Sequence, residues 1–282
     1  MNSSNPKLSL KQESHQEFEH RSQQNPVQTN QDDMMVRSLS LTLPSGRTIS
    51  EHKHAWGQLV YATSGVMTVV SQSGVWVVPS NRAVWIPPEI LHTIMTTGSV
   101  RMQTLYFPPH TTSELPNSCK VLEVSPLLRE LVIRVIQLGS LDIEKASHVP
   151  ILELIIGEVQ MINVHPLALP MPNDMRALTV VNRVLQNPGE RCTLTELAIG
   201  SGSSARTIER IFINEIQMTF GRWRQRARLV EALRLLATGE TVSTTAYLVG
   251  YESVSAFVSM FSGITGSTPG KYFDQQNTIE ST

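Results

Sequence analysis

Three histidines in the first third of the chain have types and spacing that could do chemistry. His52 and His54 are two residues apart on an expected strand, so both side chains point to the same face, and His92 opens a later strand. Three imidazoles that converge inside a small barrel could hold a divalent metal ion. Together with Trp56 and Gln58 they could instead line a pocket for a small-molecule effector, or satisfy hydrogen bonds along the strands. We favour the effector pocket and expect no cofactor, with metal ligation by the three histidines as the alternative.

A second set of residues could contact nucleic acid. Arg206 and Arg210 are four residues apart, which puts both guanidinium groups on one face of an expected helix. An arginine fork can donate to O6 and N7 of guanine together, so we expect Arg206, Thr207 and Arg210 at base edges. The next expected helix carries more arginines that spread around its surface, and of these we expect Arg224 or Arg228 on phosphate or in salt bridges.

The charge distribution favours a polyanion partner at one face of the protein. The 282 residues contain 23 lysines and arginines against 24 aspartates and glutamates. Residues 174–273 nevertheless carry a net charge of +3 and the remainder −4. Seven arginines and only three glutamates fall between residues 206 and 234. A localised positive patch of this kind is typical of nucleic-acid binding, although a charge run can also be a solvated helix face.

Short apolar runs between residues 36 and 107 predict the elements that position the histidines. The runs are rich in Val, Thr, Trp and Tyr and are separated by turn residues, with a spacing of 8–12 residues. This pattern predicts an antiparallel barrel or sandwich. The segments Thr63-Ser64-Gly65 and Thr97-Gly98 are taken as breaks between strands.

Helical periodicity follows the β segment. Residues 126–138 and 150–164 carry apolar side chains at three- and four-residue spacing, and both are more apolar than a lone surface helix needs. They either pack against the β domain and each other, or present one face to a twofold mate in a dimer. Pro166, Pro170 and Pro172 then predict a stiff hinge.

The region from residue 174 to residue 273 contains an internal repeat, offset by 48 or 49 residues. Each copy has a small residue for close helix contact, a glycine for a turn with positive φ, a serine to cap the next helix and a phenylalanine to anchor it. The copies are Ala198, Gly202, Ser204, Phe212 and Ala246, Gly250, Ser253, Phe261. Thr193 to Glu196 also forms a capping box. Each copy therefore predicts a helix-turn-helix, the alternative being a helical bundle that binds nothing.

The region resembles the AraC/XylS family of bacterial transcription regulators. Six segments carry the resemblance: Leu194–Ala198, Ser204–Phe212, Thr219–Leu229, Gly250–Ser253, Ser255–Phe257 and Gly266–Pro269. In that family two helix-turn-helix units, joined by a long helix, enter successive major grooves on one face of DNA. The resemblance implies recognition helices at residues 204–214 and 253–261, with Ser204, Ser253, Ser255 and Ser259 among the DNA contacts.

This chain departs from the family pattern at several positions. Gln217 stands where the family usually has glycine, Val254 replaces a frequent proline or polar residue, and Ser259 and Ser262 replace residues that are often basic. The second recognition helix therefore offers Ser255 and Ser259 but no cation. We expect the first unit to supply most base discrimination and the second to position the protein on the DNA backbone.

The β segment is similar to the cupin superfamily in the spacing of His52, His54, Gly65 and His92. Gln58 stands where metal-binding cupins carry glutamate, which removes an anionic ligand and weakens the affinity for iron or manganese. AraC-type regulators often retain such a barrel as a sensory domain with a remnant histidine pattern. The resemblance thus implies an effector pocket made by the histidines, Trp56 and Gln58.

These observations give a multidomain fold with α and β parts. We expect a disordered tail at 1–33, a cupin-like β-barrel effector domain at 34–110, a helical connector and candidate dimerisation region at 111–172, and an all-α domain with two helix-turn-helix units at 173–275. Cys119 and Cys192, the two cysteines, are too far apart in sequence to suggest a disulfide framework. No apolar run approaches the roughly 18 residues of a membrane span, and no secretory signal is present. We therefore expect a cytoplasmic location.

The expected function is that of a sequence-specific DNA-binding transcription regulator whose barrel senses a small molecule and modulates promoter binding. The expected partners are double-stranded DNA, a small-molecule effector and a second copy of the chain, with RNA polymerase as a further candidate and no membrane. We expect no enzymatic activity, since no nucleophile elbow or phosphate-binding glycine loop occurs. Two alternatives stay open: a cupin-type metalloenzyme fused to a helical domain, and a DNA-binding protein whose barrel serves assembly only.

Overall fold

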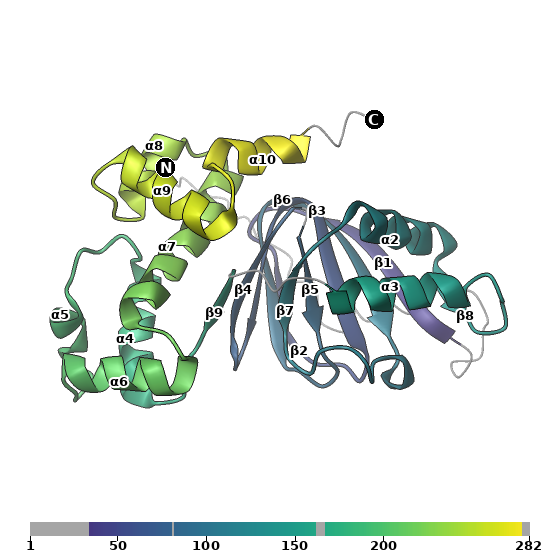
Figure 1. Cartoon of the computed structure of the whole chain (residues 1–282), viewed down its shortest axis with the longest axis horizontal. Helices are drawn as coiled ribbons and strands as arrows, with labels where there is room; N and C mark the ends of the chain where they lie inside the picture. The colour runs from purple at the N-terminus through teal and green to yellow at the C-terminus, as the bar shows by residue number, and fades with distance from the viewer. Residues whose placement is uncertain (1–33, 81, 162–166, 278–282) are drawn as a thin grey trace, which may run out of the picture.

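The computed structural model describes residues 34–80, 82–161 and 167–277, so the expected disordered tail at 1–33 lies outside the described residues. An antiparallel sheet curves around an apolar interior at one end of the molecule, and a group of helices lies at the other end (Figure 1). In the part of the chain that the structure describes, no helix is long and apolar enough to cross a membrane.

Two long strands organise the nine-stranded sheet. The strands are β1 (Met34–Leu43), β2 (Thr48–His52), β3 (Gly57–Ser71), β4 (Gly74–Pro79), β5 (Arg82–Ile86), β6 (His92–Phe107), β7 (Lys120–Glu123), β8 (Ser140–Asp142) and β9 (Ala168–Pro170). The main path runs β7-β5-β3-β6-β1-β8, with β2 added to β6 and β4 added to β3. The first half of β3 pairs with β5 and its second half with β4, so one strand serves both ends of the barrel.

The expected strand breaks at residues 63–65 and 97–98 are wrong, because the first segment lies inside β3 and the second inside β6. The pairing of β3 with β6 shifts register around Ser64, and Gly65 and Gly98 there adopt φ of +71° and +74°. A Cβ at Gly65 would lie 2.6 Å from the backbone oxygen of Ser99. Glycine therefore bends a continuous strand at this bulge and does not end it, which lets the sheet curl.

The segment expected as a connector contributes to the sheet as well as to its outer cover. Helices α2 (Pro126–Leu138) and α3 (Val149–Met161) pack on one face of the sheet, with Leu128, Val132 and Ile155 among the residues of that apolar cluster. Strand β7 pairs with β5 and β8 pairs with β1. Pro170, expected in a stiff hinge, ends strand β9, which pairs with β4.

The helical end confirms the expected repeat. Its helices are α4 (Met175–Gln186), α5 (Leu194–Ala198), α6 (Ala205–Ile216), α7 (Phe220–Ala237), α8 (Val242–Leu248), α9 (Val254–Thr265) and α10 (Pro269–Asn277). The remaining short helix, the 3-10 turn η2 (Pro109–Thr111), lies at the barrel end between β6 and β7. Both capping-box hydrogen bonds between Thr193 and Glu196 form. Gly202 and Gly250 have φ of +68° and +86°, as the two interhelical turns require. The turn glycines and cap residues thus fix two helix-turn-helix units, α5–α6 and α8–α9.

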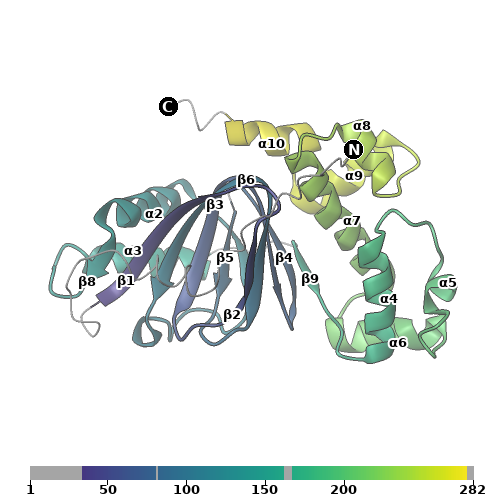
Figure 2. The same cartoon turned by 180° about the vertical axis from the view of Figure 1, so that it is seen from behind.

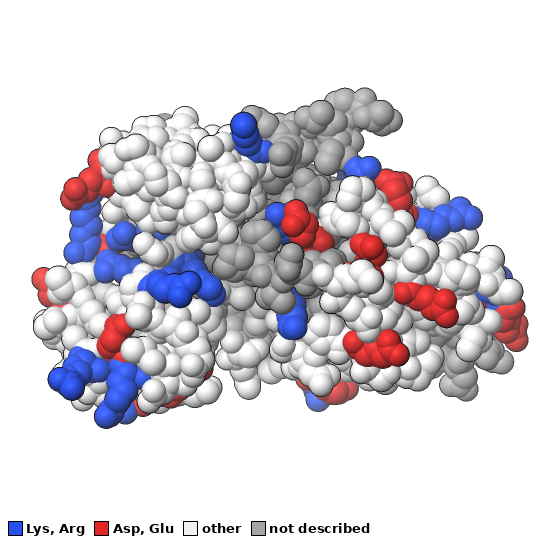
Figure 3. All heavy atoms as spheres, viewed as in Figure 1, with Lys and Arg blue, Asp and Glu red and all other residues white. Residues whose placement is uncertain are grey.

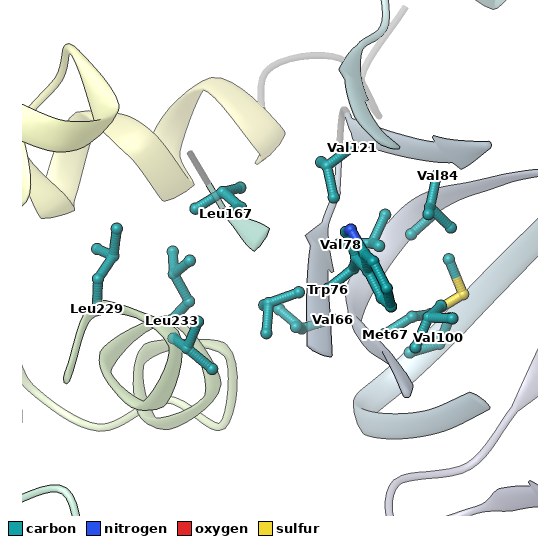
Figure 4. Close-up of a cluster of buried hydrophobic side chains, with 14 of the residues drawn as sticks. Val66, Met67, Trp76, Val78, Val84, Val100, Val121, Leu167, Leu229 and Leu233 are labelled. Atoms are coloured by element: carbon teal, nitrogen blue, oxygen red, sulfur yellow. The ribbon is translucent and has the colours of Figure 1, made fainter. Parts of the chain in front are cut away.

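Three apolar clusters hold these elements together. One lies between the sheet and helices α2 and α3. Another lies around Phe212 and Trp223, where the first helix-turn-helix unit packs against α4 and α7, and it includes Leu169 of β9. The third fills the barrel and continues into α7, α9 and α10. In Figure 4, Leu229 and Leu233 rise from α7 towards Leu167 and the strand that carries Trp76. Seen from both sides, α10 lies beside the barrel and α5 and α6 lie away from it (Figures 1 and 2).

Candidate functional site

The first candidate site is the exposed face of α6. Ser204 caps this helix by accepting a hydrogen bond from the backbone N–H of Thr207 at 3.3 Å. Arg206 and Arg210 are exposed one turn apart, and Ile208 and Phe212 on the opposite side are buried. Arg206, Thr207, Arg210, Glu209 and Ile213 line a shallow hollow on the surface. The three residues expected at base edges therefore lie together on one open face.

Basic side chains gather over the helical end of the molecule in Figure 3, whereas the barrel end carries acidic and basic side chains interspersed. Several arginines of the helical end are neutralised locally. Arg176, Arg183 and Arg191 form ion pairs with Asp174, Glu190 and Glu252. Within the described residues, Arg206 and Arg210 form no ion pair. Their charge stays available to an external anion.

The second unit presents a recognition helix of the same geometry with different chemistry. Ser253 caps α9 by accepting from the backbone N–H of Ala256 at 3.2 Å, and Ser255 Oγ lies 3.2 Å from Ser253 Oγ. Ser255 and Ser259 are exposed, as is Ser253. No lysine or arginine occurs in the sequence of α9. Its polar surface therefore consists of neutral hydroxyl groups.

Arg224 and Arg228, one of which was expected on phosphate or in salt bridges, both donate to backbone carbonyl groups within the protein. Arg224 donates to the carbonyl oxygens of Cys192 and Glu190. Arg228 Nε donates to Pro188 O at 3.1 Å. Burial is the main cause that lowers the pKa of Arg224, and the charge of Arg228 adds to it. Both arginines are half-buried and hold the loop that precedes α5 against the long helix α7.

The same loop contacts the second unit. The guanidinium of Arg228 lies 5.5 Å from the ring centroid of Tyr251, in the turn between α8 and α9. A Cβ at Gly189 would lie 2.1 Å from the backbone oxygen of Leu248, and one at Gly250 would lie 2.6 Å from Gly189 O. The loop before α5 therefore meets the turn of the second unit backbone to backbone at these glycines, and Arg228 spans the contact.

The second candidate site is the histidine cluster, formed by His52, His54 and His92. The ring centroids of His52 and His92 are 4.3 Å apart, those of His54 and His92 5.2 Å, and those of His52 and His54 5.9 Å. His52 ends β2 and faces His92 at the start of β6 in the pairing register. His54 lies beyond the end of β2, in the loop before β3, and not on the same strand as expected. The loop nevertheless returns its ring to the other two.

The cluster lies in a buried environment. His92 is fully buried and His52 is 4% exposed. Desolvation by burial lowers the pKa of His92 to about 3, and the charges of His52 and His54 act in the same direction. His92 is therefore neutral near pH 7. Among the residues that the structure describes, this is the one group of three histidine, cysteine or acidic side chains placed to hold an ion, with one ligand atom from each within 4.8 Å of the others.

Gln58 joins the cluster through its amide. Gln58 Oε1 lies 3.2 Å from His54 Nε2, and Gln58 Nε2 donates to Thr104 Oγ1 and to the Tyr106 hydroxyl, each at 3.1 Å. Trp56 is half-buried; its carbonyl oxygen lies 2.5 Å from His54 Nδ1, and its indole ring lies 5.0 Å from the guanidinium of Arg37. The structure therefore brings the histidines and Gln58 together, with Trp56 adjoining them mainly through its backbone.

Sequence reasoning missed several residues of both sites. Thr104 and Tyr106 alternate along one face of β6 and so carried a detectable signal, but only the pairing of Gln58 with Tyr106 shows where that face lies. Ile213 follows Arg206 by seven residues on α6, a helical spacing that places it on the same face. Tyr251 lies in the segment Gly250–Ser253, but nothing in the sequence shows that its ring faces Arg228. The carbonyl groups near Gly189 gave no sequence signal, because backbone acceptors have no residue type.

Comparisons with known proteins match one domain family to the part of the chain that carries each candidate site. Residues 41–151 match the AraC-like ligand binding domain, and residues 197–275 match a helix-turn-helix domain. The HTH-type transcriptional regulator NimR of Escherichia coli K12 is 30% identical over 228 residues, which cover 81% of this chain and 83% of that protein. The regulator RipA of Corynebacterium glutamicum is 34% identical over 103 residues, which cover 36% of this chain and 31% of that protein.

Among solved structures, fatty-acid-bound ToxT from Vibrio cholerae matches 87% of this chain and 96% of its own, at 13% identity and a TM-score of 0.36. The fold and the matched domains define a transcription regulator that joins a ligand-binding domain to a DNA-binding helix-turn-helix domain. The chain belongs to the AraC family of HTH-type transcriptional regulators.

Proposed function

We propose that α6 is the principal base-reading element of this regulator, with Arg206, Thr207 and Arg210 at base edges in the major groove. The observation that carries the proposal is a pair of exposed guanidinium groups without ion pairs in the described structure, one turn apart beside a hollow. A bidentate contact from arginine to guanine contributes about 1–3 kcal/mol of discrimination. Ser204 caps the helix and keeps its N-terminal turn, where these residues lie, in helical geometry.

The second unit positions the protein on the DNA backbone through Ser253, Ser255 and Ser259. Hydroxyl groups contact phosphate oxygens without reading sequence, and α9 offers no cation that could grip a guanine. Arg224 and Arg228 act as positioning residues in this proposal. Their bonds to the loop before α5 set the distance between the two recognition helices, which must match the spacing of successive major grooves.

The barrel senses a small ligand at the histidine cluster, with Gln58 and Trp56 as neighbours, and ligand occupancy changes how α6 meets DNA. Helix α7 carries the coupling, because Leu229 and Leu233 share one apolar cluster with Val66 and Trp76 of the barrel. A second link runs through β9: Trp223 Nε1 donates to Pro170 O at 2.8 Å. The ligand acts to the extent that it favours one packing of α7 on the sheet over another.

The regulator acts as a homodimer in the cytoplasm and contacts RNA polymerase when bound at a promoter. Exposed apolar side chains on α2 and α3 support a dimer through this face, including Leu127 at 46% and Leu154 at 49% exposure. Paired half-sites would then raise affinity and specificity. We propose a regulatory and not an enzymatic role, because the relatives that this chain matches are transcription regulators.

The proposal is tested by selecting bound sequences from a random DNA library and then measuring affinities of single variants. We expect Arg206→Ala and Arg210→Ala each to lower the affinity for the selected site by about 10- to 100-fold and to relax specificity at one base pair. Ser255→Ala and Ser259→Ala should weaken binding less and equally for all sequences.

Arg134→Ala is the matched control, because it removes one positive charge from exposed α2 at the barrel end. Its affinity should equal that of the unaltered protein at 0.15 M salt, where exposed charges far apart are screened. If Arg134→Ala and Arg210→Ala lower the affinity for DNA equally, the effect of Arg210 comes from the net charge of the protein and not from a contact with a base. Unchanged specificity in Arg206→Ala and Arg210→Ala would remove α6 as the reading element.

A further inference from the structure

We propose that the histidine cluster is a binding site for one divalent transition-metal ion of the zinc, nickel and copper group. The inference deepens the proposed function, on which it rests for treating the cluster as the ligand site of the barrel. It names the chemical class of ligand that the cluster takes, and it is carried by the orientation of the three rings.

All three imidazoles turn the same nitrogen away from the centre of the cluster. Nδ1 of His52 lies 2.8 Å from Ser50 O, Nδ1 of His92 lies 2.8 Å from Ile90 O, and Nδ1 of His54 contacts Trp56 O. Each carbonyl acceptor belongs to a residue two positions away in sequence, so the local backbone fixes each ring. An Nδ1–H bonded to a carbonyl leaves Nε2 as the metal-binding atom, and such bonds orient histidine ligands in known metal sites.

The three histidines lie close enough to share an ion. One ligand atom from each histidine lies within 4.8 Å of the others. Three nitrogens at about 2.0–2.1 Å from a tetrahedral zinc ion are about 3.3 Å apart. The rings therefore have to draw closer together when an ion binds.

The buried state of His92 is an independent observation that points to a ligand. His92 is fully buried, and within the described structure its Nε2 has no hydrogen-bond partner. An unsatisfied buried polar atom costs about 1–3 kcal/mol. A metal ion at the centre of the cluster would satisfy this nitrogen, whereas an apolar ligand in the same place would not.

The donor set decides which ions fit. Imidazole nitrogen suits zinc, nickel and copper, whereas manganese and magnesium prefer carboxylate and water oxygen. Gln58 places a neutral amide beside His54, and the nearby Glu89 is already paired with Lys53 at 2.8 Å. Three neutral ligands leave the charge of a dication uncompensated and a coordination position open. The open position therefore takes hydroxide or the anionic group of a small effector.

The test is titration of the full-length, tag-free, chelator-treated protein with Zn²⁺ in a calorimeter. We expect one Zn²⁺ per chain, and we expect His54→Ala to lower the affinity by at least about 100-fold, since loss of a supporting hydrogen bond alone costs 10- to 100-fold. Because His54 is half-buried, His54→Ala should keep the fold, which circular dichroism checks. X-ray absorption should place three imidazole nitrogens at about 2.0 Å from the ion.

Two control variants isolate the cluster. His110→Ala removes an exposed histidine outside it, and a double His15→Ala, His20→Ala variant removes the two histidines in the N-terminal segment outside the described residues. Both should bind Zn²⁺ as the unaltered protein does. The proposal is overturned if the unaltered protein binds no Zn²⁺, or if the tail variant loses binding and His54→Ala keeps it.

A gain-of-ligand variant tests the role of the amide. Gln58→Glu restores a carboxylate beside His54, so we expect it to bind Zn²⁺ more tightly and to acquire measurable affinity for Mn²⁺, which the unaltered protein should lack. An unchanged metal preference would contradict the argument that the neutral amide beside His54 helps to decide which ion the cluster takes. DNA binding is measured separately. If Arg210→Ala leaves DNA binding unchanged and the protein still binds Zn²⁺, only the role of α6 in base reading is overturned. If Arg210→Ala weakens DNA binding as expected and the protein binds no Zn²⁺, only the metal site is overturned.

Discussion

The two helix-turn-helix units have one backbone design and two different surfaces. In both, a glycine with positive φ makes the turn, a serine caps the recognition helix and a fully buried phenylalanine anchors it. The exposed face of α6 carries Arg206 and Arg210, and that of α9 carries only serines among its polar residues. The residues that define the fold of the motif are thus separate from those that define its chemistry, and one unit can lose its cations without losing its shape.

The two units also differ in what they pack against. Phe212 contacts Phe220 and Trp223 at centroid distances of 5.3 and 5.5 Å, in a cluster centred on the first unit. Phe261 contacts Tyr272 at 5.5 Å, in the cluster that continues into the barrel. The unit without cations therefore shares its core with the barrel interior, and the core of the unit with cations reaches the sheet only at its β9–β4 edge, through Leu169 and Val75. In the proposed function, the first copy reads the DNA sequence and the second lies against the barrel.

The largest expected effect tests this division through the two anchoring phenylalanines. Phe212→Ala and Phe261→Ala should each lower the free energy of unfolding by about 3–5 kcal/mol, because each leaves a cavity in a packed core. Calorimetry of the full chain should show Phe212→Ala lowering mainly the transition of the helical end, because its cluster touches the sheet only at the β9–β4 edge. Phe261→Ala should lower the transition of the barrel as well, because its cluster includes barrel residues. If Phe261→Ala leaves the transition temperature of the barrel unchanged, the shared cluster does not couple the barrel to the second unit.

The helix-turn-helix repeat could be predicted because each of its signals acts locally. A serine caps the helix that follows it, a glycine permits the positive φ of its own turn, and Phe212 repeats as Phe261 at the same place in each unit. The histidine cluster was predictable in part: alternation gives a face, but only the register that pairs His52 with His92 brings the rings together. The bulge at Gly65 could not be told from a strand break, because glycine with positive φ occurs both in turns between strands and in bulges within a strand.

Contacts that depend on distant backbone atoms could not be predicted. Arg224 and Arg228 have the sequence pattern of DNA-contacting arginines, and their partners are carbonyl groups more than 30 residues away. The pairing of β9 with β4, which turns part of an expected hinge into a strand, has the same origin. In each case the acceptor is a backbone oxygen, which every residue type has. Only the fold therefore shows which backbone oxygen becomes the partner.

The next largest effect concerns the contact between the units. Arg228→Ala removes a charge-assisted hydrogen bond to Pro188 O and the contact with Tyr251, so the two recognition helices should lose their fixed spacing. We expect about a 10- to 100-fold loss of affinity for the selected DNA site. The slope of log affinity against log salt should not change, because no phosphate contact is lost. A slope reduced by about one would assign Arg228 to phosphate and contradict its positioning role.

The smallest effect compares the ends of the two recognition helices. Gln217 ends α6 with φ of +54°, and Gly266 ends α9 with φ of +79°. A left-handed conformation costs a non-glycine residue about 1 kcal/mol, so Gln217→Gly should raise the free energy of unfolding by up to about 1 kcal/mol and Gly266→Ala should lower it by a similar amount. Gly263→Ala is the matched control within α9: a Cβ there meets open space and its φ is not positive, so helix propensity alone should make it stabilising. Urea midpoints at constant m value measure all three, and a stabilising Gly266→Ala would contradict the left-handed helix end on which the comparison of the two units depends.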